Sequence, residues 1–427
     1  MALVPPPGPS AGTFSPDRPS ADRRSAKQAL TNGSRVVPPE TTWERIRPHL
    51  PDLGVTRVGE ITGLDRIGIP VWFAVRPNAR TLSVSQGKGL TDAAARVSAT
   101  MEAVELAHAE EPGLPVRHAR LEEIAAAGEV VDVAALPAAR HALFGARTAI
   151  PWTQARDWAT GAPVFVPYEL VHADATVPRM PGMGAFLHST NGLASGNTLA
   201  EAVLHGLCEC IERDAVALWW QAGAARQAAT RLDLAPIAHP AVRDLLDRLR
   251  QAGVSPAVWE ATSDVGVATV RAVLSDDAAD AETRPMPGSG GAGCHPDRVV
   301  ALCRALTEAA QSRLTAIAGA RDDLGRTQYG ETQSAQALGT VRALAGAAGS
   351  RPFAAVPTHE AGSVENDLAY VVGCLARAGL DRVLVVDLSR NGLPVRVARV
   401  IVPGLEGPVD SPSWVPGRRA RAAGAAA

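Results

Sequence analysis

The stretch from Asn191 to Trp220, NGLASGNTLAEAVLHGLCECIERDAVALWW, constrains the fold more than any other part of the sequence. It opens with Gly, Ser and Asn, which is typical of a loop, and then its apolar pattern predicts a largely buried helix. Glu209 and Glu212 are three residues apart, so they lie on one face of that helix. A buried pair of carboxylates needs a cation, and hard divalent metal ions prefer carboxylate oxygens. For this stretch alone, the alternative is an ordinary acidic pair on a solvated helix face.

The same pattern occurs in two further stretches, at residues 87–105 and 291–313. In each, glycine precedes a predicted helix, and the helices align on an acidic or amide pair at positions i and i+3: Glu102 and Glu105, Glu209 and Glu212, and Glu308 and Gln311. A solvated face has no reason to repeat in this way, whereas a repeated structural unit does. The sequence therefore predicts three units of glycine-rich loop and helix whose acidic pairs converge on one centre.

Runs of β-branched residues around short turns predict β-hairpins at residues 54–77, 158–170, 258–276 and 383–404. Helical patterns alternate with these hairpins along the chain. Strands in such runs, interleaved with helices, favour an α/β (α+β) fold. We expect repeated β-hairpin–loop–helix units, with the helices packed on an antiparallel-rich sheet.

The two ends of the chain differ from the part between them. Residues 1–30 are rich in Pro, Ser, Gly and Arg and cannot bury enough apolar area to offset their ordering entropy, so we expect disorder there. Residues 31–408 carry the periodic patterns and form one predicted folded domain. Residues 409–427 lose this periodicity, which predicts an irregular tail.

Composition and missing motifs exclude several classes of protein. The net charge is −2 and aromatic residues make up 4% of the chain, so we expect no nucleic-acid partner. The five cysteines have no C-x-x-C spacing, which indicates reduced thiols and a cytoplasmic protein. A run of about eighteen apolar residues is missing, which predicts no membrane span. The sequence also has no G-x-S-x-G elbow, no zinc-ligand spacing and no G-x-G-x-x-G after a strand.

Four glutamates on two helices suit one or two Mg²⁺ ions that also bind a polyphosphate. Such a site needs cations for the phosphate oxygens, and the candidates are Lys88, Arg213 and Arg313. Asn197, at a predicted helix start, would add an amide beside backbone N–H donors, which is a natural anion site. For Lys88 alone, the alternative is a solvated lysine in a turn.

Several motifs in this order resemble the YcaO superfamily. They are S-x-x-x-E-x-x-E from Ser98, N-G-L-A-S-G-N-T-x-x-E-A from Asn191, E-x-x-E-R-D from Glu209, L-T-E-A-A-Q-S-R from Leu306 and the closing V-D-L-S-R with V-P-G-L-E. The resemblance covers roughly residues 35–408. It implies the YcaO fold and an enzyme that uses ATP and Mg²⁺ to phosphorylate backbone amides of a peptide or protein substrate.

The resemblance also implies roles for individual residues. The implied Mg²⁺ ligands are Glu102, Glu105, Glu209 and Glu212. The implied nucleotide contacts are Ser98, Asn197, Glu201 and Arg213, with Arg35 and Thr42 reaching the phosphates or ribose. Lys88 is a further candidate for nucleotide binding and Arg313 for catalysis, both by charge and position, while Arg213 is a candidate for both roles.

The nucleophile divides the family, because a neighbouring side chain gives an azoline, sulfide a thioamide and an amine an amidine. The chain ends in GRRARAAGAAA and lacks the P-x-P-x-P tail of many azoline-forming members. SVSQGKGLT, TNGLASGNTLAEA and VVPGLEGP look closer to members that occur with TfuA. We therefore predict thioamide formation with a TfuA-type partner, and a homodimer on family grounds. The alternatives are an azoline-forming cyclodehydratase with a separate clamp protein and a non-catalytic ATP-binding scaffold.

Overall fold

The structure is a computed structural model that describes residues 35–277, 288–323 and 348–425, with single positions between 339 and 346. The predicted disordered segment, residues 1–30, lies outside the described residues.

Three antiparallel sheets and one short parallel pair contain the strands of the described chain. The first sheet is β1 (Arg57–Glu60), β2 (Val71–Val75) and β3 (Val84–Lys88). The second has the order β11 (Ser289–Cys294), β10 (Thr269–Asp276) and β9 (Val254–Glu260). The largest has the order β4 (Arg117–Ala119), β5 (Ile150–Asp157), β13 (Leu384–Asp387), β14 (Arg396–Ile401) and β7 (Leu193–Gly196), with β6 (Pro163–Pro167) paired to β5. The parallel pair is β8 (Leu232–Asp233) and β12 (Arg351–Pro352).

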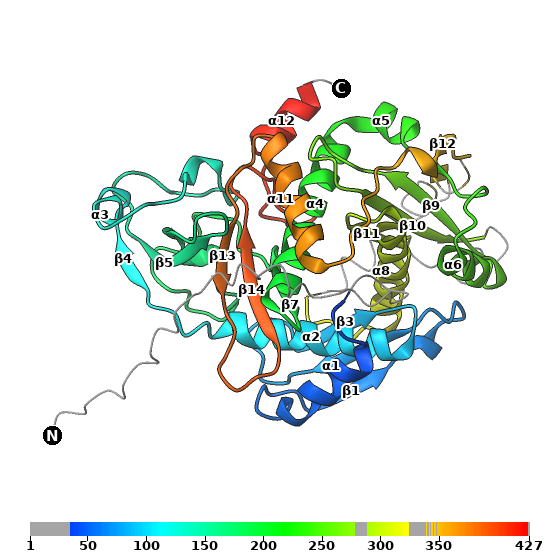
Figure 1. Ribbon diagram of the computed structural model, residues 1–427, viewed down its shortest axis with the longest axis horizontal. Coiled ribbons are helices and arrows are strands. Elements are labelled where there is room, and N and C mark those ends of the chain that lie inside the picture. Colours follow the sequence, from blue (N-terminus) through cyan, green and yellow to red (C-terminus); the bar gives the residue numbers. More distant parts are fainter. Residues whose placement is uncertain are drawn as a thin grey trace.

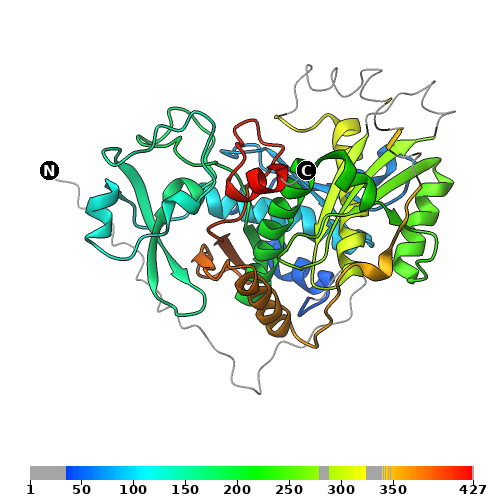
Figure 2. The same ribbon diagram turned by 90° about the horizontal axis from the view of Figure 1, so that it is seen from above.

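The α-helices lie between and around these sheets (Figure 1). They are α1 (Pro39–Ile46), α2 (Asp92–Glu110), α3 (Leu121–Ala125), α4 (Leu199–Gln221), α5 (Gly223–Ala229), α6 (Pro240–Gln251), α8 (Arg298–Ala318), α11 (Val364–Arg377) and α12 (Arg418–Ala425). The part formed by α3, β4, β5 and β6 projects to one side, which is clearest in Figure 2.

Three of the four predicted hairpins are present as antiparallel pairs: β1 with β2, β9 with β10, and β13 with β14. The range 158–170 contains β6, whose antiparallel partner β5 lies before it, so the predicted bounds are wrong there. The predicted fold class, an α+β arrangement of antiparallel sheets covered by helices, is therefore confirmed. Runs of β-branched residues on both sides of turn residues predicted these pairs, because β-branched residues are typical of half-buried strands.

Each long helix that carries an acidic or amide pair follows a short strand that is rich in Gly and small residues. β3 leads into α2, β7 into α4 and β11 into α8. The expectation that these stretches are loops is wrong, and the physical reason is close packing. A Cβ at Gly87 would lie 1.9 Å from the backbone nitrogen of Ala99, and one at Gly291 would lie 2.3 Å from that of Ala309. Without side chains at these positions, each strand packs directly against the backbone of its own helix.

The helix starts are fixed by side-chain caps. Thr91, Thr198 and Asp297 each accept a hydrogen bond from a backbone N–H in the first turn of α2, α4 and α8. Thr42 lies within α1, which begins at Pro39. Its side chain is buried and contacts a distant element, the start of α4.

The expectation of an irregular tail is wrong for Arg418–Ala425, which forms α12. Ala420 of this helix and Trp414, which precedes it, are buried against Ala217 of α4. Arg419 forms ion pairs with Asp214 of α4 and with Asp264. Ion pairs and a few apolar contacts hold this short helix in place. The sequence therefore shows no regular repeat of apolar residues there.

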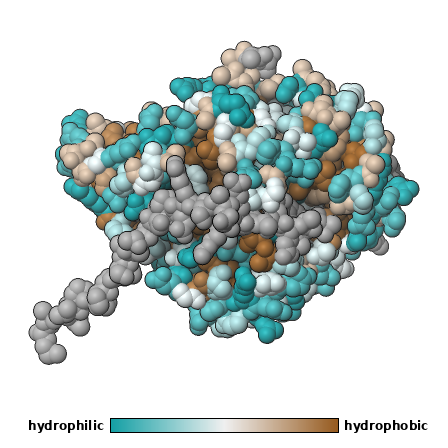
Figure 3. Space-filling model, in the orientation of Figure 1, coloured by the Kyte–Doolittle hydropathy of each residue, from teal (hydrophilic) through white to brown (hydrophobic). Residues whose placement is uncertain are grey.

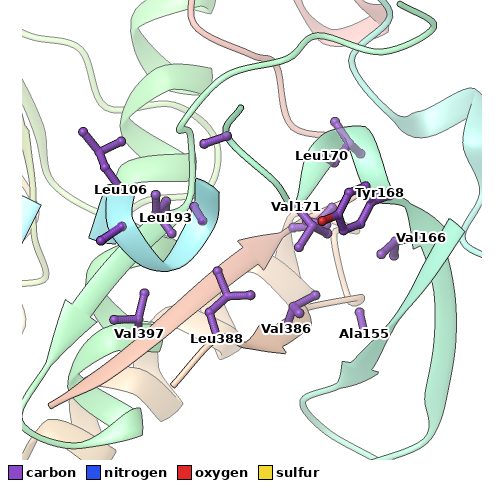
Figure 4. Packing of buried hydrophobic residues seen from close by; sticks show 14 of the residues in the cluster. Leu106, Ala155, Val166, Tyr168, Leu170, Val171, Leu193, Val386, Leu388 and Val397 are labelled. Carbon is purple, nitrogen blue, oxygen red and sulfur yellow. The ribbon is translucent and has the colours of Figure 1, made fainter. Parts of the chain in front are cut away.

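The largest core lies where α2 meets the six-stranded sheet. Leu106 of α2 packs in one apolar cluster with Ala155, Val386 and Val397 of three strands (Figure 4). The face seen in Figure 3 is mostly hydrophilic, with separate apolar areas between. Among the described residues, no helix combines the length and apolar character that crossing a membrane requires.

Candidate active site

Glutamates of α2, α4 and α8 lie within electrostatic range of one another, as the repeated pattern predicted. Glu105 of α2 lies within electrostatic range of Glu102 on its own helix and of Glu209 on α4. Glu212 of α4 is within the same range of Glu308 on α8. Each of these three helices follows a strand of a different sheet, and their acidic faces lie near one another.

Burial dominates the titration of these carboxyl groups. Burial raises the pKa of Glu105 to about 8 and that of Glu209 to about 7, and nearby carboxylates raise both further. The pKa of Glu102 and that of Glu212 are also raised, again chiefly by burial. Such shifts mean that, without a bound cation, burial favours the neutral, protonated form of these carboxyl groups.

Glu308 has the opposite behaviour. Burial alone would raise its pKa, but the charges of Lys88 and Arg213 lower it to about 2. Lys88 Nζ is 2.6 Å from Glu308 Oε2, and the backbone nitrogen of Ala292 donates to Oε1 at 3.3 Å. Lys88 is therefore an ion-pair partner inside the site, and the alternative of a solvated turn lysine is excluded.

Hydrogen bonds orient the glutamates of α2. Ser195 Oγ, on β7, donates to Glu105 Oε1 at 2.6 Å. The backbone nitrogen of Gln86, on β3, donates to Glu102 Oε2 at 3.0 Å. β3 thus holds a carboxylate of its own unit, whereas β7 holds one of the neighbouring unit. Ser98 lies one turn before Glu102 on the same face of α2 and is half-buried.

Arg213 lies at the solvent side of the carboxylates. Its Nη1 is 3.5 Å from Glu212 Oε1 and its Nη2 is 4.0 Å from Glu209 Oε1, and its side chain is 30% exposed. A guanidinium in this position can reach an incoming anion without leaving its carboxylate neighbours.

The N-terminal end of α4 holds the predicted nucleotide contacts together. Thr42 Oγ1 donates to Asn197 Oδ1 at 3.0 Å, which joins α1 to the start of α4. Glu201 accepts from the backbone nitrogen of Val36 at 2.6 Å and from Asn197 Nδ2 at 3.2 Å. The backbone N–H of Asn197 also donates to Glu201, so it is already used within the protein. Arg35 lies nearby, within electrostatic range of His205 on α4.

Arg313 is bound elsewhere. Its Nε is 2.9 Å from Asp65 Oδ2 and its Nη2 is 3.0 Å from Asp276 Oδ1, and the residue is buried. Because it lies two residues after Gln311, it points to the other side of α8. The expectation that Arg313 acts in catalysis finds no support in this geometry, since two carboxylates already neutralise its charge.

Further arginines that the sequence motifs do not indicate lie within electrostatic range of the acidic group. Arg304 on α8 is within electrostatic range of Glu209 and Glu212, and its Nη2 is 3.2 Å from His205 Nε2. Arg271 on β10 is within electrostatic range of Glu308, and Arg321, after α8, is within that range of Glu102 and also forms an ion pair with Asp323. Arg304 could have been found, because it precedes Glu308 by four residues and so shares its helix face.

The donor set fits Mg²⁺ that is shared with a polyphosphate. In the described part of the chain, no three His, Cys, Asp or Glu side chains lie close enough together to bind a metal ion by themselves. Mg²⁺ usually takes one or two carboxylates and completes its shell with phosphate oxygens and water. The buried carboxylates could supply oxygen ligands, and the nearby Arg213 and Arg304 could supply positive charge for phosphate oxygens.

The family whose sequence model matches residues 86–406 is described as YcaO cyclodehydratase, ATP- and Mg²⁺-binding. A protein of Rhizobium leguminosarum bv. trifolii from the tfuA 3′ region, itself uncharacterized, is 41% identical over 90% of this chain and 91% of its own length. An uncharacterized protein of Methanothermobacter thermautotrophicus is 37% identical over 91% of this chain and 98% of its own length.

Two solved structures share the fold. YcaO from Methanopyrus kandleri, bound with AMPPCP and Mg²⁺, has a TM-score of 0.70 and 27% identity, and the match covers 90% of this chain and 95% of that one. A heterocyclase in complex with substrate and cofactor has a TM-score of 0.72 and 23% identity over 90% of this chain. The chain spans about half of that heterocyclase, 54% of its length.

Proposed function

Because the chain belongs to the YcaO family, we propose that it uses ATP and Mg²⁺ to activate backbone amides of a peptide or protein. The observation that carries the proposal is the convergence of buried glutamates from α2 and α4 beside Arg213. The family description names ATP and Mg²⁺. The relative from Methanopyrus kandleri, whose length the chain nearly spans, was solved with an ATP analogue and Mg²⁺.

In this proposal the roles follow from position. The Mg²⁺ ligands would be Glu102, Glu105, Glu209 and Glu212. Bound Mg²⁺ supplies charge neutralisation for the phosphates and fixes their orientation. Arg213 would orient the terminal phosphoryl group, and Thr42, Asn197 and Glu201 would hold the nucleotide at the start of α4, with Arg35 and Ser98 nearby. Lys88 keeps Glu308 ionised at the edge of the site.

We further propose that the product is a thioamide. Hydrosulfide would add to the amide carbon, and the oxygen would take the γ-phosphoryl group as its bond to ADP breaks. Loss of phosphate and of the sulfur proton then leaves a carbon–sulfur double bond. An amide oxygen is a poor leaving group and a phosphate a good one, so this sequence explains the need for ATP. The relative found in a tfuA 3′ region supports a TfuA-type partner for sulfur delivery.

A second product is supported by a specific observation. The family description names cyclodehydratases, and a heterocyclase shares the fold. In that case a Cys, Ser or Thr side chain of the substrate would be the nucleophile, and a separate clamp protein would present the peptide.

The product assay therefore incubates this protein with ATP, Mg²⁺, sulfide, a TfuA-type partner and a candidate peptide. A gain in mass from replacement of oxygen by sulfur supports the thioamide, whereas loss of one water supports the azoline.

The nucleotide site is tested separately, by AMPPCP binding with and without Mg²⁺. We expect Glu209→Gln to weaken binding at least about tenfold, or about 1.4 kcal/mol, because one ligand oxygen loses its charge. The matched control is Glu122→Gln on exposed α3, which should bind as the wild type does. Equal Mg²⁺-dependent binding by both variants would contradict the site. Binding without turnover under any condition would favour a non-catalytic scaffold. The expected homodimer stays a prediction.

A further inference from the structure

The face of α4 that carries Glu209 and Arg213 continues to an exposed tryptophan. Trp220 follows Arg213 by seven residues and Glu209 by eleven, both close to whole numbers of turns, so the three share one face. Trp220 lies about 10 Å beyond Arg213 along the helix axis. It is 42% exposed, which is unusual for so large an apolar side chain.

The indole of Trp220 is held in place on one side. Its ring centroid is 5.3 Å from that of Trp219, with the planes at 75°. Trp219 is itself buried, packs against Trp259 and donates from Nε1 to Thr230 Oγ1 at 2.9 Å. An aromatic ring that rests on a buried, hydrogen-bonded neighbour keeps its orientation while part of its surface faces solvent.

Arg271 connects this indole to the charged site. Its guanidinium carbon lies 5.3 Å from the centroid of the Trp220 ring, within the range of a cation–π contact. The charged groups within electrostatic range of Arg271 are Glu308, Asp410, Arg213 and Glu212. Arg271 therefore links Trp220 to the charged groups around Arg213, with which Trp220 also shares a helix face.

We propose that Trp220 and Arg271 form the subsite that binds the substrate peptide next to the reacting amide. The inference rests on the proposed function, since it assumes that Arg213 marks the phosphoryl end of the nucleotide. The indole surface fits an apolar or aromatic side chain of the peptide, and the Arg271 guanidinium can donate to its carbonyl oxygens.

The layout of α4 favours a peptide over a nucleobase at this position. The residues proposed to hold the nucleotide, Asn197 and Glu201, lie at the start of α4, and Glu201 is about 28 Å from Trp220 along the axis. The order along the helix is thus nucleotide contacts, carboxylates, Arg213 and then the indole. A peptide amide that takes the terminal phosphoryl group must approach from the far side of Arg213, where Trp220 lies.

The experiment uses the full chain loaded with AMPPCP and Mg²⁺. The probe is a pentapeptide, Gly-Gly-Xaa-Gly-Gly, in which Xaa carries a photoreactive benzophenone. We expect cross-links to the C-terminal turns of α4 and to β10. The yield should fall at least about fivefold in Trp220→Ala and in Arg271→Gln. It should be unchanged in the control Leu143→Ala, which removes an 89% exposed apolar side chain elsewhere.

Each other outcome overturns the inference. Cross-links that map elsewhere would place the peptide at another surface. A loss of AMPPCP affinity in Trp220→Ala would assign the indole to the nucleotide, and a change of oligomeric state would assign it to a subunit interface. Failure of the wild type to bind AMPPCP would defeat the proposed function itself. Normal AMPPCP binding with no cross-link near Trp220 defeats only the subsite.

Discussion

At Glu105 the protein encloses a carboxyl group that accepts a hydrogen bond from Ser195 Oγ and lies near Glu102 and Glu209. Burial raises its pKa from 4.5 to about 8. The folded state therefore binds this proton more tightly than the unfolded chain does. Its contribution to stability is complete below the unfolded pKa and is lost as the pH rises through about 8.

This sign gives a prediction for the metal-free protein. The free energy of unfolding of the wild type, minus that of Glu105→Gln, should fall by at least about 1.4 kcal/mol between about pH 5 and 8, the value of one pKa unit. The glutamine does not titrate, so the difference isolates this one carboxyl. Urea unfolding of both proteins in chelator at several pH values measures it. Parallel stability curves would show that Glu105 is not a buried acid.

The residues of the site could be predicted from the sequence where they belong to the repeated pattern of glycine-rich stretch and helix. Glu102, Glu209 and Glu308 could be aligned because each follows a glycine-rich stretch at a similar distance. Arg271 has no such relation to them, since it comes from a strand and approaches the site only through the pairing of β10 with β11. Arg313 was selected by its spacing from Gln311, but spacing alone does not show that Asp65 and Asp276 already bind it.

At the scale of elements, the glycines of β3, β7 and β11 decide how closely each strand approaches its helix. Sequence patterns identified the glycines and the helices, but indicated loops where strands are present. The patterns used to find strands depend on alternating side chains, and a stretch such as SGGAGC in β11 has almost none. In the structure these glycines are positions of close packing. The backbone of the adjoining helix occupies the space that a side chain would otherwise fill.

Gly291→Ala tests this packing. Its Cβ would lie 2.3 Å from the nitrogen of Ala309 and 2.4 Å from the oxygen of Ala305, both backbone atoms that cannot turn aside. We expect the free energy of unfolding to fall by about 1–3 kcal/mol or more, as in other overpacked cores. Gly63→Ala is the control, because nothing lies within 4 Å of a Cβ there. Equal thermal unfolding midpoints for the two variants would contradict direct packing of strand on helix.

At the scale of the whole molecule, the chain closes on itself at α4. The C-terminal segment returns to this helix, where the backbone nitrogen of Glu406 donates to Asp214 Oδ1 at 3.0 Å. Glu406 in turn accepts from the backbone nitrogens of Gly417 at 2.8 Å and Ala420 at 2.9 Å. The segment is therefore folded around Glu406 and fixed beside Arg213. Sequence patterning could not predict this closure, because it depends on ion pairs between residues some two hundred positions apart.

The last prediction concerns this closure. Arg419 pairs with Asp214, which is fully buried, at 2.9 Å from its Nε and 3.0 Å from its Nη2. Removing only the arginine leaves a buried carboxylate with its main cation missing, which typically costs about 3–5 kcal/mol. Removing both charges costs less, because no unpaired charge remains in the interior. We therefore expect Arg419→Met to be strongly destabilised and the double variant Arg419→Met with Asp214→Asn to recover part of that loss.

The thermal unfolding midpoints of the two variants and of the exposed control Arg418→Met test whether this ion pair holds the tail. The control should unfold as the wild type does, since its side chain is exposed on α12. If the double variant were no more stable than Arg419→Met alone, packing of the arginine stem would hold the tail instead of the ion pair. If Arg419→Met unfolded as the wild type does, the tail would not be anchored to α4 in solution. In the expected case, an ion pair one residue from Arg213 couples the end of the chain to the rim of the site.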